Sequence, residues 1–210
     1  MTSALSARSS RKRDAILAAG RDLFLAQGYR GTSVEAIAAS AHVSKQTVYK
    51  HFADKQQLLS AIVTPVLADA GAAVRTQVTA LADTDDVRSE LVTLASGYLR
   101  SVLSEPVVQL RRLVIGEAGT VPDLADTYYE QAPAATMRAF ADAFAALDHR
   151  GVLRVPDPPR AAEHFAFLVV GSSIDRALFY GGSATLARLD VDDHARSAVE
   201  VFLAAYLPRR

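Results

Sequence analysis

The stretch that decides the fold is residues 31–55, GTSVEAIAASAHVSKQTVYKHFADK. Apolar residues recur in it at the three- and four-residue spacing of helices, in the runs Val34–Ala41 and Val48–Phe52. A short break at His42-Val43 separates the two runs. We therefore expect two short helices joined by a tight turn, which is the arrangement of a helix-turn-helix that binds the major groove of DNA.

Polar residues predict where these two helices begin. The sequence Thr32-Ser33-Val34-Glu35 matches a capping box, in which a hydroxyl and a carboxylate satisfy free amides of the first helical turn. We expect Thr32 to be the N-cap of the first short helix. Ser44 is expected to cap the second, which the pattern places at Lys45–Phe52.

The second short helix carries two apolar residues and many polar ones. Val48 and Phe52 lie four residues apart and are expected to face the interior. A groove-binding helix needs donors and acceptors for base edges, and cations or hydroxyls for phosphates. Such groups fill the other positions, which are Ser44, Lys45, Gln46, Thr47, Tyr49, Lys50 and His51. An ordinary amphipathic helix with a solvated side is the alternative interpretation of this pattern taken alone.

The rest of the chain is also predicted to be helical, so the expected fold class is all-α. A packing helix is expected from Ser9 or Ser10 to Gly28, where glycine tolerates a positive φ. Further helices are expected at 55–81 with Asp54 as cap and a bend at Pro65, at 87–104, 106–116, 122–150 with a bend at Pro133, 160–180 and 190–207. We place the domain boundary after residue 55, with a helix-turn-helix domain at 1–55 and a larger helical domain at 56–210.

Charge is distributed unevenly although the chain is neutral, with 23 Lys+Arg and 23 Asp+Glu. Residues 1–55 hold nine basic and four acidic residues, a net charge of +5, so the remainder carries −5. A basic segment on an acidic body favours contact with a polyanion. Chance clustering of surface charge is the alternative. The basic run Arg8–Arg13 is either a further contact to DNA or a solvated tail.

Several function classes are excluded by composition and motif. Cysteine is absent, which excludes disulfide scaffolds, thiolate zinc sites and cysteine nucleophiles. The five histidines lack metal-ligand spacing, and the sequence has no phosphate-binding loop or dinucleotide fingerprint. We expect no enzyme activity, metal or cofactor. The uncharged stretch Phe165–Ile174 is half of the roughly 20 residues that a membrane helix needs, and no secretory signal begins the chain. A cytoplasmic protein without a membrane partner is the expectation.

Residues 10–60 resemble the DNA-binding domain of TetR-type transcriptional regulators. The similarity is carried by LFLAQGYRGTS at the end of the first helix, by VEAIAASAHVSKQTVYKHF and by the DKQQLL that follows. The later segment RRLVIGEAGTVPDLADTYYE is similar to the AefR-like subgroup. The turn lacks the glycine of many helix-turn-helices, as is common in this family.

The resemblance implies DNA contacts for the residues that match the family's motif. These are the phosphate contacts Tyr49, His51 and Lys55, the helix-start contact Thr32, and the base contacts Lys45, Gln46 and Thr47; Ser44 and Lys50 complete the predicted DNA-binding set.

The resemblance also implies that the helices after residue 55 form an effector cavity and a dimer interface. Aromatic residues and methionine suit an apolar, adaptable pocket, and a packed core is the alternative. The predicted ligand-binding set is Tyr98, Leu103, Leu113, Glu117, Tyr128, Tyr129, Met137, Phe140, Phe144 and Phe165. The last two helices would form a four-helix bundle across a two-fold axis. The predicted dimer-interface set on them is Leu168, Ser172, Arg176, Phe179, Val199, Phe202 and Tyr206.

The expected function is that of a homodimeric transcriptional regulator, a repressor released from a pseudo-palindromic double-stranded operator by a small apolar or amphipathic effector. A helical carrier or interaction protein that does not bind DNA is the alternative. The polar side of Lys45–His51 argues against that alternative.

Overall fold

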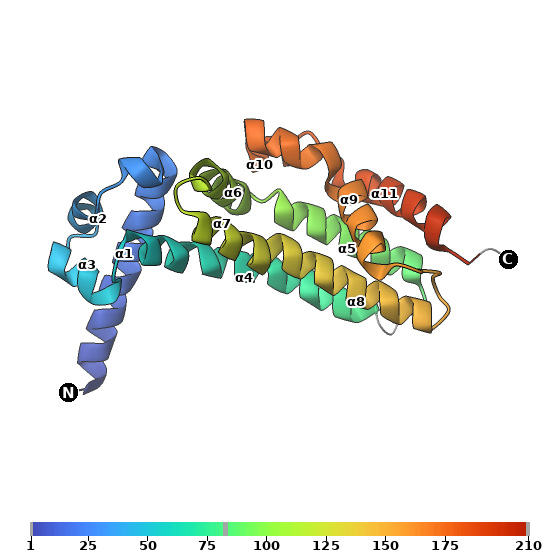
Figure 1. Ribbon diagram of the computed structural model, residues 1–210, viewed down its shortest axis with the longest axis horizontal. Helices are drawn as coiled ribbons and strands as arrows, with labels where there is room; N and C mark the ends of the chain where they lie inside the picture. The colour runs from blue at the N-terminus through green and yellow to red at the C-terminus, as the bar shows by residue number, and fades with distance from the viewer. Residues whose placement is uncertain (1, 82–83, 209–210) are drawn as a thin grey trace. The chain divides into compact units, whose positions relative to one another are not determined.

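The computed structural model describes residues 2–81 and 84–208, except for the side chains of residues 2–8 and 73. All regular elements within these residues are helical, which confirms the all-α fold class (Figure 1). In chain order they are α1 (Thr2–Gly31), α2 (Val34–Ser40), α3 (Lys45–His51), α4 (Lys55–Leu81), α5 (Val87–Val102), α6 (Glu105–Glu117), α7 (Pro122–Tyr129), the π-helical turn η1 (Glu130–Ala134), α8 (Ala135–His149), α9 (Pro158–Tyr180), α10 (Gly182–Leu186) and α11 (Val191–Tyr206).

The predicted helix-turn-helix is present as α2 and α3, which pack on each other and on α1. Ile16, Phe24, Ile37 and Val48 are buried among these helices, each at 2% exposure or less. Burying side chains of this size contributes roughly 1.5–3 kcal/mol each. This shared core fixes α3 against the other two helices, so that its remaining side chains face solvent.

Two of the four predicted N-caps, which are Ser9 or Ser10, Thr32, Ser44 and Asp54, are confirmed. Ser44 accepts a hydrogen bond from the amide three residues on, as the N-cap of α3. At the start of α4, Asp54 accepts from the Gln57 amide at 2.7 Å, and the Gln57 side chain accepts from the Ala53 amide at 2.7 Å. The prediction for α2 was wrong by one residue, because Ser33 and not Thr32 is the N-cap.

The ends of α1 also differ from the expectation. The helix begins at Thr2 and not at Ser9 or Ser10. At Gly28 the backbone has φ 72° and ψ 173°, a turn that glycine adopts without steric cost, and the chain then completes a further helical turn to Gly31. His42 takes over the glycine's usual role in the tight turn, with φ 53°. Histidine is among the residues that tolerate this left-handed conformation better than most.

The chain divides into two compact units. Unit 1 comprises Met1–Val66 and Leu110–Tyr128, and unit 2 comprises Leu67–Gln109 and Tyr129–Arg210. The helix-turn-helix therefore shares a unit with the second half of α6 and with α7. The boundary after residue 55 stays a prediction, and α4 continues past it through Pro65 as one helix.

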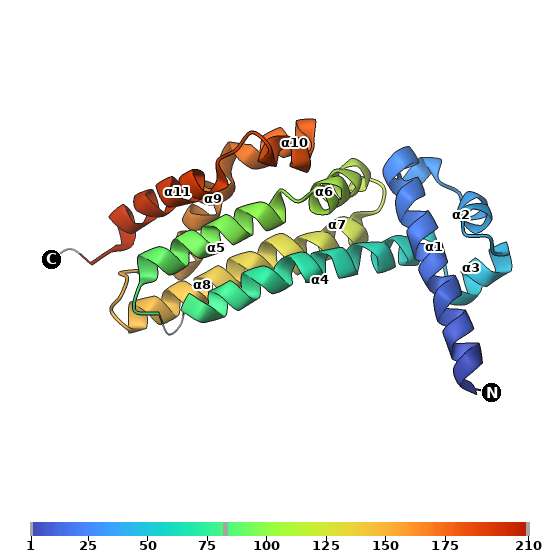
Figure 2. The same cartoon turned by 180° about the vertical axis from the view of Figure 1, so that it is seen from behind.

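Unit 2 is built around α5, α8, α9 and α11, and Figure 2 shows α5 running beside α11. Phe140, Phe144, Phe165 and Phe202 are all fully buried at its centre. Their ring centroids lie 4.9 to 6.2 Å apart where they touch. Aromatic pairs at such separations contribute about 0.5–1.5 kcal/mol beyond the area they bury. This aromatic cluster is the core of unit 2.

Three local features of the second half depart from simple helices. At Pro133, where a bend was predicted, the helix has a π-helical turn, η1, in which proline's missing amide removes one helical hydrogen bond. The structure also has two features that the sequence did not predict. Gly171 interrupts α9 with φ 38° and ψ −135°, and the short helix α10 begins at Gly182 directly after α9.

One described helix, α4, is long and apolar enough to cross a membrane, with a mean hydropathy of 1.5 over its most apolar 18 residues. The expectation of no such segment considered only the C-terminal half and missed it. Interior helices of soluble proteins meet the same criterion, and on α4 Leu58, Leu59 and Val63 are buried. Only 29% of the apolar window is buried, so length and composition alone carry this assignment.

Candidate nucleic-acid interface

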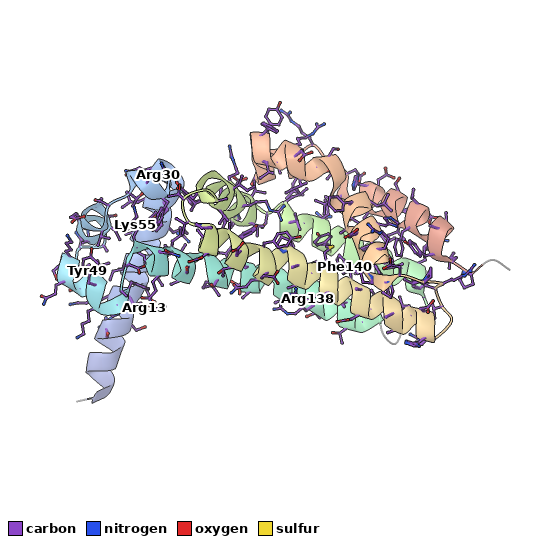
Figure 3. The ribbon with its side chains drawn as sticks, in the orientation of Figure 1. Arg13, Arg30, Tyr49, Lys55, Arg138 and Phe140 are labelled. Carbon is purple, nitrogen blue, oxygen red and sulfur yellow. The ribbon has the colours of Figure 1, made fainter. Side chains whose placement is uncertain are left out.

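The second helix of the helix-turn-helix, α3, presents polar side chains to solvent. Gln46 and Lys50 are exposed and Tyr49 is 46% exposed, whereas Val48 is 2% exposed (Figure 3 labels Tyr49). The amide of Gln46 carries two donors and an acceptor, and the Lys50 ammonium carries three donors. This combination can bind base edges and phosphates, as the sequence predicts.

The two hydroxyls at the start of α3 are bonded to each other. Ser44 Oγ accepts from the Thr47 amide at 3.1 Å and lies 2.9 Å from Thr47 Oγ1. These bonds fix the first turn of α3 and therefore the direction of the side chains that follow. Ser44 and Thr47 thus have a capping role here, and their contact with DNA stays a prediction.

Lys45, the first residue of α3, is paired across the turn. Its Nζ lies 2.5 Å from Glu35 Oε1 on α2 and 5.7 Å from the Tyr49 ring centroid. The hydrogen bond to Lys45 lowers the pKa of Glu35, and the same bond raises the pKa of Lys45. Both residues are therefore charged at neutral pH, and Glu35 balances the charge of Lys45 at the surface.

Lys55, a predicted phosphate contact, is half-buried and bonded to the protein backbone. Its Nζ donates to the backbone carbonyl of Tyr29 at 2.8 Å and to that of Thr32 at 2.9 Å. The ammonium also lies 4.2 Å from the centroid of the Tyr29 ring. These carbonyls belong to the backbone around the end of α1, so Lys55 joins that end to the start of α4. Lys55 therefore has a structural role that the sequence did not predict, and its contact with a phosphate stays a prediction.

The predicted DNA contact of Thr32 is corrected, because Thr32 is buried. Its side chain is 1% exposed, and its hydroxyl donates to the carbonyls of Leu23 at 3.1 Å and Gly28 at 2.8 Å. The backbone amide of Thr32 donates to the Tyr29 carbonyl at 3.4 Å. With both donors directed into the protein, Thr32 does not fit the predicted amide and hydroxyl contact with DNA.

Two further polar residues lie at the C-terminal end of α3, one on the helix itself and one on α1. His51 is half-buried, with its ring 6.3 Å from that of Phe52. Arg13 of α1 places its guanidinium carbon 5.4 Å from the Phe52 ring centroid, a cation–π distance, and it is exposed (Figure 3). The sequence had offered Arg13 only as part of a basic run, because nothing in the local pattern reveals its contact with Phe52.

The predicted ligand-binding residues of unit 2 include its closely packed core. Phe140, Phe144 and Phe165 are fully buried members of the aromatic cluster, and Tyr98 packs edge-on against Phe140 at 5.1 Å. In this structure these four side chains are packed core residues, which is the alternative interpretation that the sequence left open. The set continues with the buried Leu103, the half-buried Met137 and Tyr129, which is 60% exposed. Their contact with an effector stays a prediction.

The other three predicted ligand residues, Leu113, Glu117 and Tyr128, belong to unit 1. Glu117 Oε2 lies 3.9 Å from the Arg30 guanidinium, and the hydroxyl of the buried Tyr128 accepts from Arg111 Nε at 3.2 Å. Tyr128 thus has a hydrogen-bond partner within the unit, whereas the buried Oε2 of Glu117 has none among the described residues.

The predicted dimer-interface set divides into exposed and buried members. Ser172, Arg176 and Phe179 on α9 are exposed, with Phe179 at 78%. Leu168 and Tyr206 are half-buried. Val199 and Phe202 are fully buried in the core of their own chain, so they cannot also face a partner, and we correct their assignment.

The sequence missed the exposed apolar residues Phe167 and Tyr180 on α9, each 74% exposed, and Val201 on α11, 54% exposed.

Among residues 2–81 and 84–208, no group of three or more His, Asp or Glu side chains is arranged to hold a metal ion.

Comparisons with known proteins agree with this description. Residues 16–62 match the family model for bacterial regulatory proteins of the tetR family, and residues 89–208 match the AefR-like transcriptional repressor C-terminal domain. The curated regulator TcmR of Streptomyces glaucescens is 41% identical over 58 residues, which span 28% of this chain and 24% of that protein.

Solved structures extend the similarity to the whole chain. A TetR-family transcriptional regulator from Mesorhizobium loti is 32% identical, with a TM-score of 0.84 over 96% of this chain and 99% of its own. The flavonoid-responsive regulator FrrA is 27% identical, with a TM-score of 0.75 over 96% of this chain and 100% of its own. These relatives are transcriptional regulators and not enzymes. Because the C-terminal model covers more than half of the chain and the M. loti protein is similar over nearly its full length, this protein belongs to the TetR family of transcriptional regulators, with an AefR-like C-terminal domain.

Proposed function

We propose that the protein is a cytoplasmic homodimeric repressor that binds a pseudo-palindromic operator through α3 and leaves it when a small apolar or amphipathic effector binds. The observation that carries the proposal is the exposed polar side of α3, where Gln46, Tyr49 and Lys50 face solvent beside a packed core. Family membership supports the same conclusion.

The residues of α3 divide by chemistry into two groups of contacts. Gln46, with a donor and an acceptor on one planar amide, suits the adenine edge in the major groove, where such a bidentate pair discriminates by about 1–3 kcal/mol. Tyr49 and Lys50 suit phosphates, which fix the position of the helix without specifying sequence. Arg13, exposed next to the end of α3, is a further candidate for a phosphate contact.

Dimerisation follows from the demand for two half-sites. Each chain provides one recognition helix, and a pseudo-palindrome places two half-sites about 34–36 Å apart on one side of the DNA. We propose that the exposed apolar residues of α9 and α11 pair across a two-fold axis. Phe167, Phe179, Tyr180 and Val201 support this, because each is a large apolar side chain that is more than half exposed on these two helices.

The effector is proposed to bind in unit 2, around Tyr98, Met137 and Phe140. The aromatic and methionine side chains there suit apolar ligands, and the description of FrrA as flavonoid-responsive supports an effector with aromatic rings. Such a ligand must open the packed aromatic cluster, so it would favour a conformation of unit 2 different from the closed one. An effector weakens DNA binding only through its different affinity for the two conformations, and about 2.7 kcal/mol would correspond to roughly a hundredfold effect.

Selection from a pool of random duplexes at moderate salt tests the DNA part of the proposal. We expect the purified protein to enrich a two-fold-related motif. A protein that enriches no sequence would contradict the proposal. Calorimetric titration of flavonoids with and without the enriched duplex then tests the effector part, because linkage requires DNA to weaken effector binding by the same factor.

A further inference from the structure

The ammonium of Lys45 lies between an acidic group and an aromatic ring. Glu35 Oε1, on the first turn of α2, is 2.5 Å from Lys45 Nζ. The Tyr49 ring centroid, one helical turn along α3, is 5.7 Å from the same ammonium. The side chains of Lys45 and Glu35 are 52% and 60% exposed, so the pair lies at the surface where DNA would approach.

The local structure fixes both partners. Glu35 lies two residues after Ser33, whose hydroxyl accepts from the Ala36 amide and sets the first turn of α2. Lys45 follows Ser44, which caps α3 in the same way. Both ionised groups are stabilised by their mutual hydrogen bond, which lowers the pKa of Glu35 and raises that of Lys45. Two helix starts are therefore joined by a pair that is neutral as a whole.

A neutral pair behaves differently toward phosphates and toward bases. Phosphates lie along every duplex, and a free lysine gains sequence-independent affinity from them by releasing counterions. A lysine whose charge is balanced by a neighbouring carboxylate gains less, and the carboxylate itself repels phosphates. An exposed ion pair is worth only about 0–1 kcal/mol, so a well-placed base acceptor such as guanine O6 or N7 can still draw the ammonium away.

We propose that Glu35 is a specificity-determining residue: it balances the charge of Lys45 and so prevents Lys45 from acting as a non-specific phosphate contact. This inference rests on the proposed function. Glu35 is not itself a base contact. Its proposed role is to control how strongly α3 prefers the operator over other DNA sequences. Specificity commonly requires such an element that opposes the wrong partner as well as contacts that favour the right one.

The chain offers a matched control for the test. Asp22 on α1 is exposed and lies 3.3 Å from the guanidinium of its neighbour Arg21. Asp22→Asn removes one negative charge and frees one cation in the same unit, as Glu35→Gln does. The two variants therefore change the net charge of the protein equally and differ in which cation they free.

The experiment measures fluorescence anisotropy with two probes, a duplex enriched from the random pool and a scrambled duplex of equal length. We expect Glu35→Gln to tighten binding to the scrambled duplex by up to about fivefold and to make the salt dependence steeper by up to about 0.9 in log–log slope. Binding to the enriched duplex should tighten less, so the ratio of the two affinities should fall. In a Lys45→Ala background, Glu35→Gln should have no more effect than Asp22→Asn.

An unchanged affinity ratio in Glu35→Gln, or an equal change in Asp22→Asn, would overturn the inference while leaving the proposed function intact. The proposed function fails separately, if the wild-type protein enriches no duplex at all. Thermal unfolding of each variant serves as the check on folding, since removing an exposed pair should leave the melting temperature nearly unchanged.

Discussion

The guanidinium of Arg30, in the last turn of α1, donates to the hydroxyl of Thr120 in the connection between α6 and α7, from Nη2 at 2.5 Å and from Nε at 3.1 Å. The two residues are 90 positions apart in sequence and lie in the same compact unit. Glu117, one turn earlier, lies 3.9 Å from the same guanidinium. The end of α1 is thus joined to a segment that enters unit 1 from the second half of the chain.

This contact predicts a local effect on stability. Thr120→Val keeps the shape of the side chain and removes the acceptor, so we expect faster amide hydrogen exchange in residues 118–121 and no change in the core of unit 2. Because the contact is exposed, the free energy of unfolding should fall by no more than about 1 kcal/mol. Unchanged exchange in 118–121 would mean that the contact does not order this connection.

A substitution of Lys55 tests whether the residue acts on the stability of the fold or on DNA binding. Lys55→Met should remove two charge-assisted hydrogen bonds and lower the free energy of unfolding by about 1–3 kcal/mol. The salt dependence of DNA binding, measured below the melting temperature, should stay the same. A fully stable variant whose log–log slope fell by about one unit would restore the phosphate contact that the sequence implied.

Glu105 predicts a pH dependence of stability. Its carboxylate accepts from the Ser183 amide at 2.8 Å and from the Gln109 side chain at 3.1 Å, and these bonds lower its pKa, with the Ser183 amide as the main cause. A lowered pKa stabilises the folded state above the ordinary glutamate value of about 4.3, and this contribution is lost as the pH falls through the folded value.

Urea unfolding between pH 3 and pH 7 measures that contribution. The wild-type protein should lose stability below about pH 4.3, and Glu105→Gln should lose part of this dependence. Glu163→Gln, an exposed substitution on α9, is the control. Equal pH profiles for the Glu105→Gln variant and the wild type would contradict the assigned role.

The dimer proposal predicts different outcomes for neighbouring residues of α11. Val201 is 54% exposed, so Val201→Asp should leave the fold intact and give monomers in analytical ultracentrifugation at micromolar concentration, because an unpaired charge is costly at the centre of an interface. Phe202 is fully buried within its own chain, and Phe202→Asp should unfold unit 2 instead. A Val201→Asp variant that remains dimeric would place the interface elsewhere.

Local signals in the sequence were sufficient to predict much of the fold. Ser44 and Asp54 cap the helices predicted for them, because a cap depends on residues three or four positions away. Thr32 failed as a cap because its hydroxyl is bound to the carbonyls of Leu23 and Gly28, on the preceding helix. The packing of α1 decides whether Thr32 or Ser33 is the cap, and local sequence spacing gives no information about that packing.

For the candidate sites too, features set by local sequence were predictable, and features set by contacts between distant residues were not. The polar side of α3 follows from its own periodicity, and the structure exposes Gln46, Tyr49 and Lys50 accordingly. Phe202 was misassigned and the structural role of Lys55 was missed, because a cation near a DNA-binding helix, or an apolar residue on an amphipathic one, has two possible partners. Contacts 26 residues away in sequence decide the case of Lys55, and the aromatic cluster decides that of Phe202.

The central claim, that α3 binds base edges, is tested most directly by comparing Gln46→Ala with the wild-type protein on two duplexes in parallel titrations at one salt concentration. On the duplex enriched from the random pool, we predict that the variant loses about 1–3 kcal/mol of binding free energy, because one good base contact is removed. On a scrambled duplex of equal length, we predict unchanged affinity, because Gln46 carries no charge to contribute to phosphate binding. Equal losses on both duplexes, or no loss on either, would contradict the assignment of α3 as the helix that recognises sequence.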